Sequence, residues 1–166
     1  MWVVLKYKLN EINILKENLN RILGKNPIYF VPKIEYQKNI GNKFKTFQKA
    51  LLEGYLICFD EKFKDQNIIN NLKFCRGIKS LLDGFKNNQN DILNFVKRCK
   101  QFQNNKGFLT QNFFENENLK RGKFVTGPFT NLIFDIISKN SSNLEILIGK
   151  YKTTISNKTN YLYRPI

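Results

Sequence analysis

The sequence predicts an α+β fold in two parts, a mixed α/β domain followed by a small all-β domain. Near the N-terminus, an apolar strand over residues 2–7 precedes a segment with helical spacing over residues 10–24. Near the C-terminus, short apolar runs alternate with turn residues such as glycine, proline, serine and asparagine. Five such runs in about fifty residues are typical of a small β-barrel.

The first helix is indicated by apolar residues at helical spacing, with charged residues on the other side. Asn10 is the expected N-cap of this helix and Gly24 its expected end. Its apolar face consists of Ile12, Leu15, Leu19, Ile22 and Leu23.

The remaining elements follow from the length and period of the apolar runs. The polar segment 36–49, with turn signals at Gly41 and Asn42, is expected to be a hairpin or a loop, and the Asn- and Gln-rich residues 104–116 a linker. A helix is expected over 64–72 and another after an N-cap at Asn90 or Asp91. A turn followed by a strand is expected over 74–82, and strands are expected over 28–32, 51–59 with a break at Gly54, 124–125, 132–137, 144–148, 151–155 and 161–163.

The composition excludes several kinds of catalytic site. Without histidine there is no Ser-His-Asp triad, no Cys-His dyad and no His-ligated zinc. The three cysteines are odd in number and far apart, so buried free thiols are expected. Asp60, Glu61 and Asp65 are the closest carboxylate grouping, and a helix cap with solvated charges explains them better than a metal site. We therefore expect no enzyme activity, no metal and no cofactor.

The net charge of +15 favours a polyanionic partner. A lysine-rich composition also arises in AT-rich genomes, which explains part of the excess. Even so, so positive a surface attracts nucleic acid through counterion release. No run approaches the roughly 18 apolar residues of a membrane span, and Lys6 and Lys8 follow the short apolar start at once. A cytoplasmic location is expected.

Four short segments stand in an informative order along the chain. They are Trp2-Val3-Val4 with Glu11, the run LLEGYL at 51–56, Arg76-Gly77-Ile78 with Gly84, and the run RGKFVTGPF at 121–129. In order and spacing they resemble the NusG family of transcription elongation factors, and the last resembles the opening of a KOW motif. The resemblance implies a NusG N-terminal domain, an α/β sandwich, over 1–103, a linker over 104–117, and a five-stranded SH3-like KOW barrel over 118–166.

The resemblance also implies partners and contact residues. The N-terminal domain of the family binds the clamp helices of the largest subunit of RNA polymerase through an apolar depression. The KOW domain contacts the termination factor Rho or a small-subunit ribosomal protein. The matching polymerase-binding positions are Trp2, Tyr7, Leu51, Leu52 and Tyr55, and the matching KOW positions are Gly127, Pro128, Phe129 and Tyr151.

Each of these positions also has a purely structural interpretation. Leu51 and Leu52 are equally suited to filling a core, Tyr55 somewhat less so, and Tyr151 is equally suited to being an ordinary strand residue.

The chain is also expected to be a monomer without membrane attachment.

Several residues depart from the family pattern. Leu51, Leu52 and Glu53 stand where the family has two phenylalanines and a proline, while Asn131 and Phe134 stand at KOW glycine positions. Asn131 can adopt the left-handed conformation, whereas Phe134 cannot do so at low cost. Together with the high charge, these departures indicate a resemblance to specialised members of the family, the RfaH type, more than to its general factor. Proteins of this type suppress pausing and termination on particular operons and often read non-template DNA.

RfaH-type proteins can also hold their C-terminal domain as a helical hairpin. Thr153, Thr154 and Ile155 favour strands here, so strands are expected, and local propensity leaves open a helical state before binding.

Basic residues of the first domain are the candidates for nucleic-acid contact. Tyr36, Phe44 and Phe47 lie between some of them and can stack on unpaired bases. A solvated charge explains any single basic residue better than nucleic-acid contact does, so the group as a whole is the candidate. The basic candidates are Lys38, Lys43, Lys45, Lys49, Arg76, Lys79, Lys97 and Arg98.

The sequence thus leaves two functions open. One is an elongation and antitermination regulator that binds RNA polymerase. The other is a general RNA-binding or ribosome-associated KOW protein.

Overall fold

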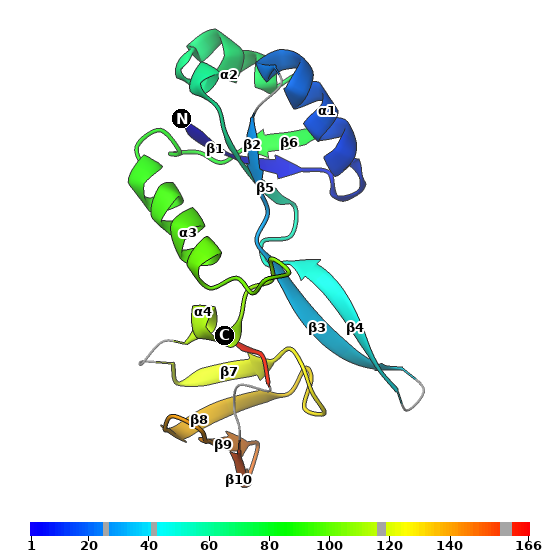
Figure 1. Ribbon diagram of the computed structural model, residues 1–166, viewed down its shortest axis with the longest axis vertical. Coiled ribbons are helices and arrows are strands. Elements are labelled where there is room, and N and C mark those ends of the chain that lie inside the picture. Colours follow the sequence, from blue (N-terminus) through cyan, green and yellow to red (C-terminus); the bar gives the residue numbers. More distant parts are fainter. Residues whose placement is uncertain (25–26, 41–42, 116–118, 157–160) are drawn as a thin grey trace. The chain divides into compact units, whose positions relative to one another are not determined.

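The structure, a computed structural model, describes residues 1–24, 27–40, 43–115, 119–156 and 161–166 (Figure 1). The side chains of residues 37–39 and 44 lie outside this description. The chain divides into two compact units. Unit 1 comprises Met1–Pro32 and Ala50–Gln101, and unit 2 comprises Lys33–Lys49 and Phe102–Ile166.

Unit 1 is built on a four-stranded antiparallel sheet with the order β2-β5-β1-β6. The strands are β1 (Trp2–Tyr7), β2 (Ile28–Phe30), β5 (Tyr55–Phe59) and β6 (Ile78–Leu81). The predicted strand over 51–59 is confirmed only from Tyr55 onward. Leu51 and Leu52 lie in the turn before it, because Gly54 has a φ of 81° and ends the extended backbone.

Helices cover this sheet with aliphatic side chains. They are α1 (Ile12–Leu23), α2 (Gln66–Leu72) and α3 (Gln89–Gln101), with short 3-10 turns η1 (Leu9–Glu11) and η2 (Glu61–Lys64). The predicted apolar face of α1 is confirmed, since Leu15, Leu19 and Leu23 are buried in one cluster with Val3 and Leu5 of β1.

Two predicted helix starts are wrong. Asn10 lies inside η1, so the residue before α1 is Glu11, whose side chain makes no capping hydrogen bond. Helix α3 already begins at Gln89, so Asn90 and Asp91 lie in its first turn. In both places a preceding turn or a tertiary contact fixes the helix start, and the nearest asparagine does not. The predicted end of α1 at Gly24, with a φ of 96°, is confirmed.

Unit 2 contains a two-stranded hairpin and a larger sheet. The hairpin consists of β3 (Lys33–Ile40) and β4 (Lys43–Ala50), so the hairpin alternative for 36–49 is confirmed, while the turn signals Gly41 and Asn42 lie outside the described residues. The five-stranded sheet is antiparallel, with the order β10-β9-β8-β7-β11. Its strands are β7 (Arg121–Phe124), β8 (Ile133–Lys139), β9 (Leu144–Ile148), β10 (Tyr151–Ile155) and β11 (Tyr163–Pro165).

The C-terminal segment therefore forms strands, as its β-branched residues predict. The described pairings join β10 to β11 through the other three strands and do not themselves close the sheet. Closure into a KOW barrel stays a prediction.

Aromatic rings fill the interior of the five-stranded sheet. Phe124 and Phe134 stack with ring centroids 4.3 Å apart, and the ring of Tyr163 lies 5.6 Å from that of Phe134. Gly122 is paired directly with Phe134, and a Cβ at Gly122 would lie 2.8 Å from the Phe134 ring. The ring thus occupies the space that a side chain at 122 would need.

The segment expected to be a linker makes ordered contacts inside unit 2. It contains the short helix α4 (Gln111–Phe114), and Phe108 and Leu109 are buried. Gln111 Oε1 accepts a hydrogen bond of 2.8 Å from the backbone N of Tyr163, which attaches α4 to β11. The domain boundaries at 103 and 118 stay predictions.

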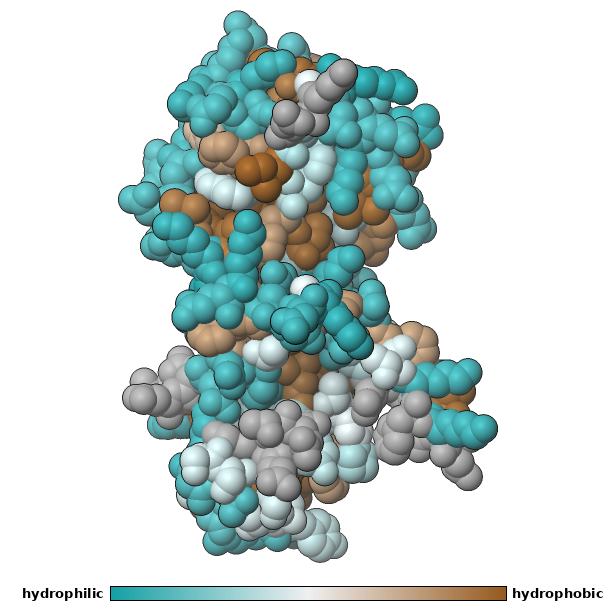
Figure 2. All heavy atoms as spheres, in the orientation of Figure 1, coloured by the Kyte–Doolittle hydropathy of each residue, from teal (hydrophilic) through white to brown (hydrophobic). Residues whose placement is uncertain are grey.

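All three cysteines, Cys58, Cys75 and Cys99, are free and buried, as predicted. Burial raises the pKa of the Cys58 and Cys99 thiols to about 12. In the described part of the chain, no helix combines the length and the apolar character needed to cross a membrane. Hydrophilic side chains cover much of the surface in view in Figure 2, with smaller apolar areas between them.

Candidate partner-binding site

A shallow hollow lies beside the C-terminal end of β1 in unit 1. We call it the Gly54 hollow. Because three lysines and one carboxylate, Glu53, line it, the hollow is positively charged. Its lining residues are Lys6, Tyr7, Lys8, Leu9, Glu53, Gly54 and Lys79.

The turn before β5 shapes this hollow. The backbone N of Tyr7 donates to the Gly54 carbonyl at 2.8 Å, and the backbone N of Tyr55 donates to the Leu52 carbonyl at 3.2 Å. A Cβ at Gly54 would meet Leu9 Cδ2 and the Tyr7 carbonyl at 3.7 Å, which is an ordinary contact. The glycine is therefore required for its positive φ and not for space.

Two tyrosines predicted for polymerase contact occupy different environments here. Tyr7 is 8% exposed and belongs to the core. The pKa of its hydroxyl is raised, mainly by burial and to a smaller extent by the negative charge of Glu53. Tyr55 is half-buried, opposite Lys6 on β1, whose Nζ lies 5.7 Å from the tyrosine ring centroid. This is within the range of a cation–π contact.

The predicted leucines lie in the turn. Leu52 is 39% exposed, and Leu51 is half-buried with its backbone N bonded to the Pro32 carbonyl at 2.7 Å. Neither leucine is fully buried, so the core-filling interpretation does not fit either of them well. Leu52 is the one that an approaching partner can reach most easily.

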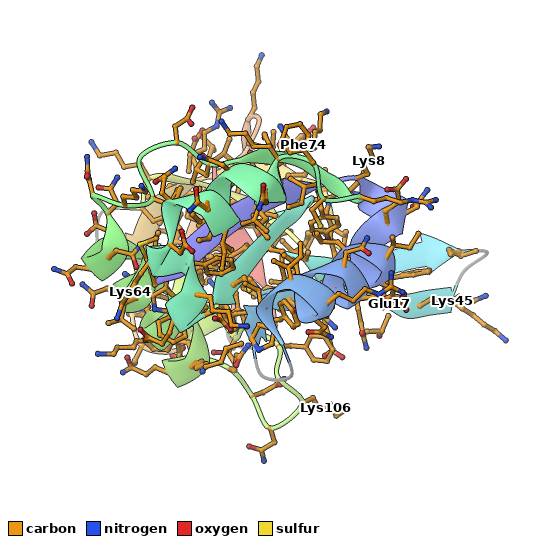
Figure 3. The ribbon with its side chains drawn as sticks, turned by 90° about the horizontal axis from the view of Figure 1, so that it is seen from above. Lys8, Glu17, Lys45, Lys64, Phe74 and Lys106 are labelled. Atoms are coloured by element: carbon orange, nitrogen blue, oxygen red, sulfur yellow. The ribbon has the colours of Figure 1, made fainter. Side chains whose placement is uncertain are left out.

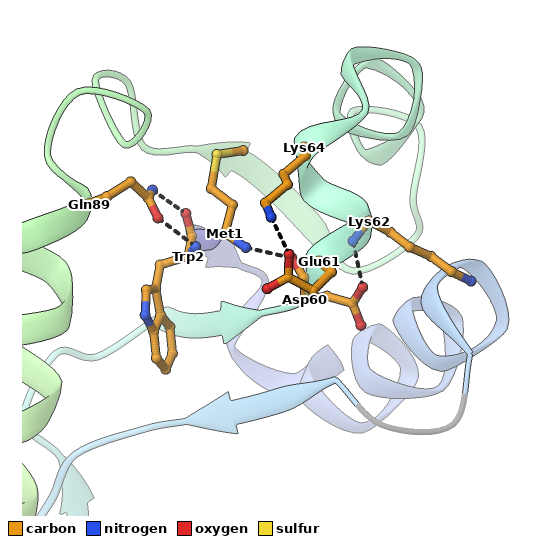
Figure 4. Close-up of polar contacts among 7 residues, drawn as sticks. All are labelled: Met1, Trp2, Asp60, Glu61, Lys62, Lys64 and Gln89. Atoms are coloured by element: carbon orange, nitrogen blue, oxygen red, sulfur yellow. Dashed lines mark hydrogen bonds and ion pairs between the residues drawn. The ribbon is translucent and has the colours of Figure 1, made fainter.

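Trp2 lies at the opposite end of β1 from the Gly54 hollow. It pairs with Phe59, while Lys6 pairs with Tyr55, so the ladder separates Trp2 from Tyr55. The side chain of Gln89 binds the backbone of Trp2 with both of its polar atoms, at 2.8 and 2.7 Å (Figure 4). The indole ring lies 5.1 Å from the ring of Phe59. Trp2 is thus not brought together with the other predicted polymerase-binding residues.

The basic candidates are distributed over three places. Lys43, Lys45 and Lys49 alternate along β4 in unit 2 and are exposed, and the Lys45 side chain extends away from the hairpin in Figure 3. Arg76 and Lys79 lie before and on β6, and Lys79 lines the Gly54 hollow.

The last two candidates, Lys97 and Arg98, are exposed on α3. The side chains of Lys38 and Phe44 lie outside the described part. Tyr36 and Phe47, the remaining aromatic candidates, stack with ring centroids 5.6 Å apart and an interplanar angle of 26°.

The turn between β7 and β8 is shaped by two residues with positive φ and by contacts with aromatic rings outside it. Gly127 has a φ of 81°, and a Cβ there would lie 2.6 Å from the ring of Tyr161. Phe129 is half-buried with its ring 5.7 Å from that of Phe124, whereas Pro128 is exposed. Asn131 has a φ of 73°, the left-handed conformation that its side chain tolerates.

Tyr151 is the most accessible of the predicted KOW positions. It begins β10, directly after the turn that follows the third strand of the sheet, β9, and its side chain is 82% exposed. Lys152, the next residue, forms an ion pair with Glu145 on β9 at 2.8 Å.

The carboxylates near 60–65 have structural roles. Asp60 Oδ1 accepts from the backbone N of Lys62 at 2.9 Å, and Asp65 Oδ1 accepts from that of Asn67 at 2.8 Å, so both residues cap helical turns as predicted. Glu61 pairs with Lys64 (Figure 4). Among the described residues no group of three or more His, Cys, Asp or Glu side chains is arranged to hold a metal ion.

Sequence reasoning missed part of each site. It did not include Lys6, Lys8 and Leu9 in the polymerase-contact set, although the run Lys6-Tyr7-Lys8-Leu9 surrounds a predicted contact residue. Lys8 is exposed and its side chain is seen in Figure 3. The role of Gly122 depends on its pairing with Phe134, which no local pattern reveals.

Comparisons with known proteins give limited information. No family model matches the chain, and no curated protein matches it. Among solved structures, the crystal structure of the MjSpt4:Spt5 complex in conformation B is similar over 100% of this chain and 98% of the other, with 9% identity and a TM-score of 0.31. A likeness at this TM-score is too weak to assign a fold family or a partner.

Proposed function

We propose that this chain is a non-enzymatic regulator of transcription elongation that binds RNA polymerase through the Gly54 hollow. The observation that carries this proposal is the hollow itself. It is lined by Tyr7, one of the positions that match the family's polymerase-contact residues, and two further ones lie beside it, a reachable Leu52 and a half-buried Tyr55.

The chemistry of the hollow suits a helical partner with acidic side chains. Leu52 and Tyr55 offer apolar surface, and tyrosine is among the residues that most often dominate binding energy. Lys6, Lys8 and Lys79 supply positive charge that steers acidic partners. The clamp helices of the largest polymerase subunit are the proposed partner.

The five-stranded sheet of unit 2 is proposed as a KOW domain that contacts Rho or a small-subunit ribosomal protein. Tyr151 is the proposed contact, because it is a large aromatic side chain left almost entirely exposed. In this role the chain acts as a specialised relative of the RfaH type, present in the cytoplasm as a monomer.

In vitro transcription tests this function most completely. The full chain is added to core RNA polymerase on templates with and without a pause element, and pause lifetimes are compared. We expect the chain to shorten pauses and the Tyr55→Ala variant to lose most of this effect. Lys100→Gln, a change at an exposed α3 residue that does not line the hollow, is the control and should retain activity. Equal activity of Tyr55→Ala would show that the docking surface is wrong.

A second candidate function is favoured by the charge. With a net charge of +15, the chain is suited to bind RNA or ribosomes without polymerase. That function predicts a steep salt dependence for RNA binding and no effect of the chain on polymerase pausing.

A further inference from the structure

A groove in unit 2 is lined by positive charge and by an aromatic ring. We call it the basic groove. Its cations are Lys49 of β4, Lys123 of β7 and Arg164 of β11, and Tyr36 of β3 and Asn131 also line it. Neither aspartate nor glutamate is among its described lining residues. An anionic ligand in this groove therefore meets three cations and no repelling carboxylate among the described lining residues.

Two of the cations lie directly opposite each other. Arg164 is paired with Lys123 on the neighbouring antiparallel strand. The residues next to them, Tyr163 and Phe124, are buried, so the alternation of strand side chains puts both cations on the outer face. Like charges directly opposite each other on a sheet are destabilising.

The sheet compensates a similar charge elsewhere but not here. Arg121, on the same face of β7, has Asp135 of β8 as a partner at 3.4 Å. The residue opposite Lys123 on β8 is Ile133, which offers no charge. Among the described residues, neither Lys123 nor Arg164 forms an ion pair. An external anion would relieve the repulsion between these two cations.

The aromatic part of the groove points to the kind of anion. Tyr36 is half-buried and stacks on Phe47, with ring centroids 5.6 Å apart. A stacked aromatic pair beside cations is the combination that single-stranded nucleic-acid sites use, because bases stack on the rings and phosphates bind the cations. A duplex hides the faces of its bases, so it cannot use the ring in this way.

We propose that the basic groove binds single-stranded nucleic acid, with Lys123 and Arg164 contacting successive phosphates and Tyr36 stacking on a base. Lys49 adds a third positive charge along the strand. This inference rests on the second candidate function, RNA binding, and names a site for it. Its test contains no RNA polymerase, so the groove and the polymerase docking can each fail alone.

Fluorescence anisotropy with the full chain tests the groove. The probes are labelled RNA and DNA strands of the same sequence, each about 12 nucleotides long, which is within the usual site size. The test variant is Lys123→Gln with Arg164→Gln. The matched control is Lys120→Gln with Arg121→Gln, which removes the same charge from residues that do not line the groove.

We expect the test variant to weaken binding at least about tenfold and to reduce the slope of log Kd against log salt by about 1.4, since each phosphate contact on a single strand contributes about 0.7. The control should change the affinity only about twofold, through general charge. Equal losses of affinity in both variants would show that only the overall charge of the chain matters for binding, and would overturn the proposal.

Stacking has its own variant. Tyr36→Leu should weaken binding about fivefold or more, while Tyr36→Phe keeps the ring and should bind as the wild type does. Comparison of the RNA and DNA arms identifies which strand the groove prefers, and binding of either one supports the site. Tighter binding to a duplex of the same sequence, or equal binding to polyglutamate, would overturn the assignment to single-stranded nucleic acid.

Discussion

The two sheets of this protein are filled in different ways. The interior of the four-stranded sheet in unit 1 is mainly aliphatic, with Leu5 of β1 and Leu56 of β5 packed against Leu15 and Leu19 of α1. The buried cluster of the five-stranded sheet in unit 2 is half aromatic, since Phe124, Phe134 and Tyr163 pack with three aliphatic side chains.

The difference follows from what covers each sheet. In unit 1, helices supply side chains from a second layer, so branched aliphatic residues are enough to fill the space. In the described part of unit 2 the only helix is α4, which has four residues. The strands must fill the interior from their own side chains, and rings give the largest volume per position. Such close packing demands a glycine where two large groups would meet, as at Gly122.

The largest expected effect is in the aromatic interior. Phe134→Ala should lower the free energy of unfolding by about 3–5 kcal/mol, because it removes a fully buried ring and leaves a cavity. Near-UV circular dichroism during urea unfolding follows this loss. Leu19→Ala in α1 is the matched change in unit 1, followed by the fluorescence of the single tryptophan, Trp2. A loss below about 1 kcal/mol for Phe134→Ala would contradict the description of the core.

A smaller effect is expected from filling the space opposite that ring. Gly122→Ala should cost about 1–3 kcal/mol, since its new Cβ would overlap the Phe134 ring. Phe134→Leu in the same chain should recover part of this cost, which a double-mutant cycle in urea measures. Additive effects of the two changes would show that the close approach does not matter.

The pH dependence of stability should separate the two units. The pKa of the Cys58 thiol is raised by burial from its ordinary value of 9.0 to about 12, so the native state keeps a proton that the unfolded state loses. The stability from this thiol is complete below about pH 9 and is lost as the pH rises toward about 12, at up to about 1.4 kcal/mol per pH unit. The buried Tyr163 of unit 2, whose pKa is also raised to about 12, starts to act only above its ordinary value of 10.0.

Urea unfolding at several pH values, followed by Trp2 fluorescence, measures the response of unit 1. Cys58→Ala should make the decrease between about pH 9 and about pH 10 less steep, after its own loss of stability is subtracted. The buried thiols of Cys75 and Cys99, whose pKa values are also raised by burial, account for the rest of the decrease. An unchanged slope in this variant would show that the thiol does not titrate on unfolding.

The smallest effect is expected for an exposed ion pair. Asp135→Asn removes the partner of Arg121, and both side chains are more than half exposed. Surface pairs of this kind contribute about 0–1 kcal/mol, and the contribution decreases with salt. Urea unfolding at low and high salt checks this, and a loss above about 2 kcal/mol would mean that the face is more buried than the structure describes.

Local patterns predicted the elements of this fold well and its contacts poorly. The apolar period of α1 and the run of β5 are strong signals, because each reflects burial on one face. Helix starts were less predictable. Neither Asn10 nor Asn90 caps its helix as predicted. The turn η1 precedes α1, and the hydrogen bond between Gln89 and the Trp2 backbone fixes the start of α3.

The candidate sites depend on strand register, which the sequence does not display. Tyr55 and Lys6 meet because β1 and β5 pair in one register, and the same register separates Tyr55 from Trp2. Lys123 and Arg164 are far apart in the chain and become neighbours only through the pairing of β7 with β11. Family resemblance supplied candidate residues without showing which of them lie together.

The most direct test of the proposed function is the affinity of the full chain for core RNA polymerase. Leu52→Asp places a charge on the exposed leucine beside the Gly54 hollow, and Leu82→Asp makes the same change on an exposed leucine of the same unit outside it. Docking through the hollow predicts that Leu52→Asp weakens binding by about tenfold or more while Leu82→Asp binds nearly as the wild type does. Equal affinities of the two variants, or no binding of the wild-type chain to the polymerase, would contradict the proposal.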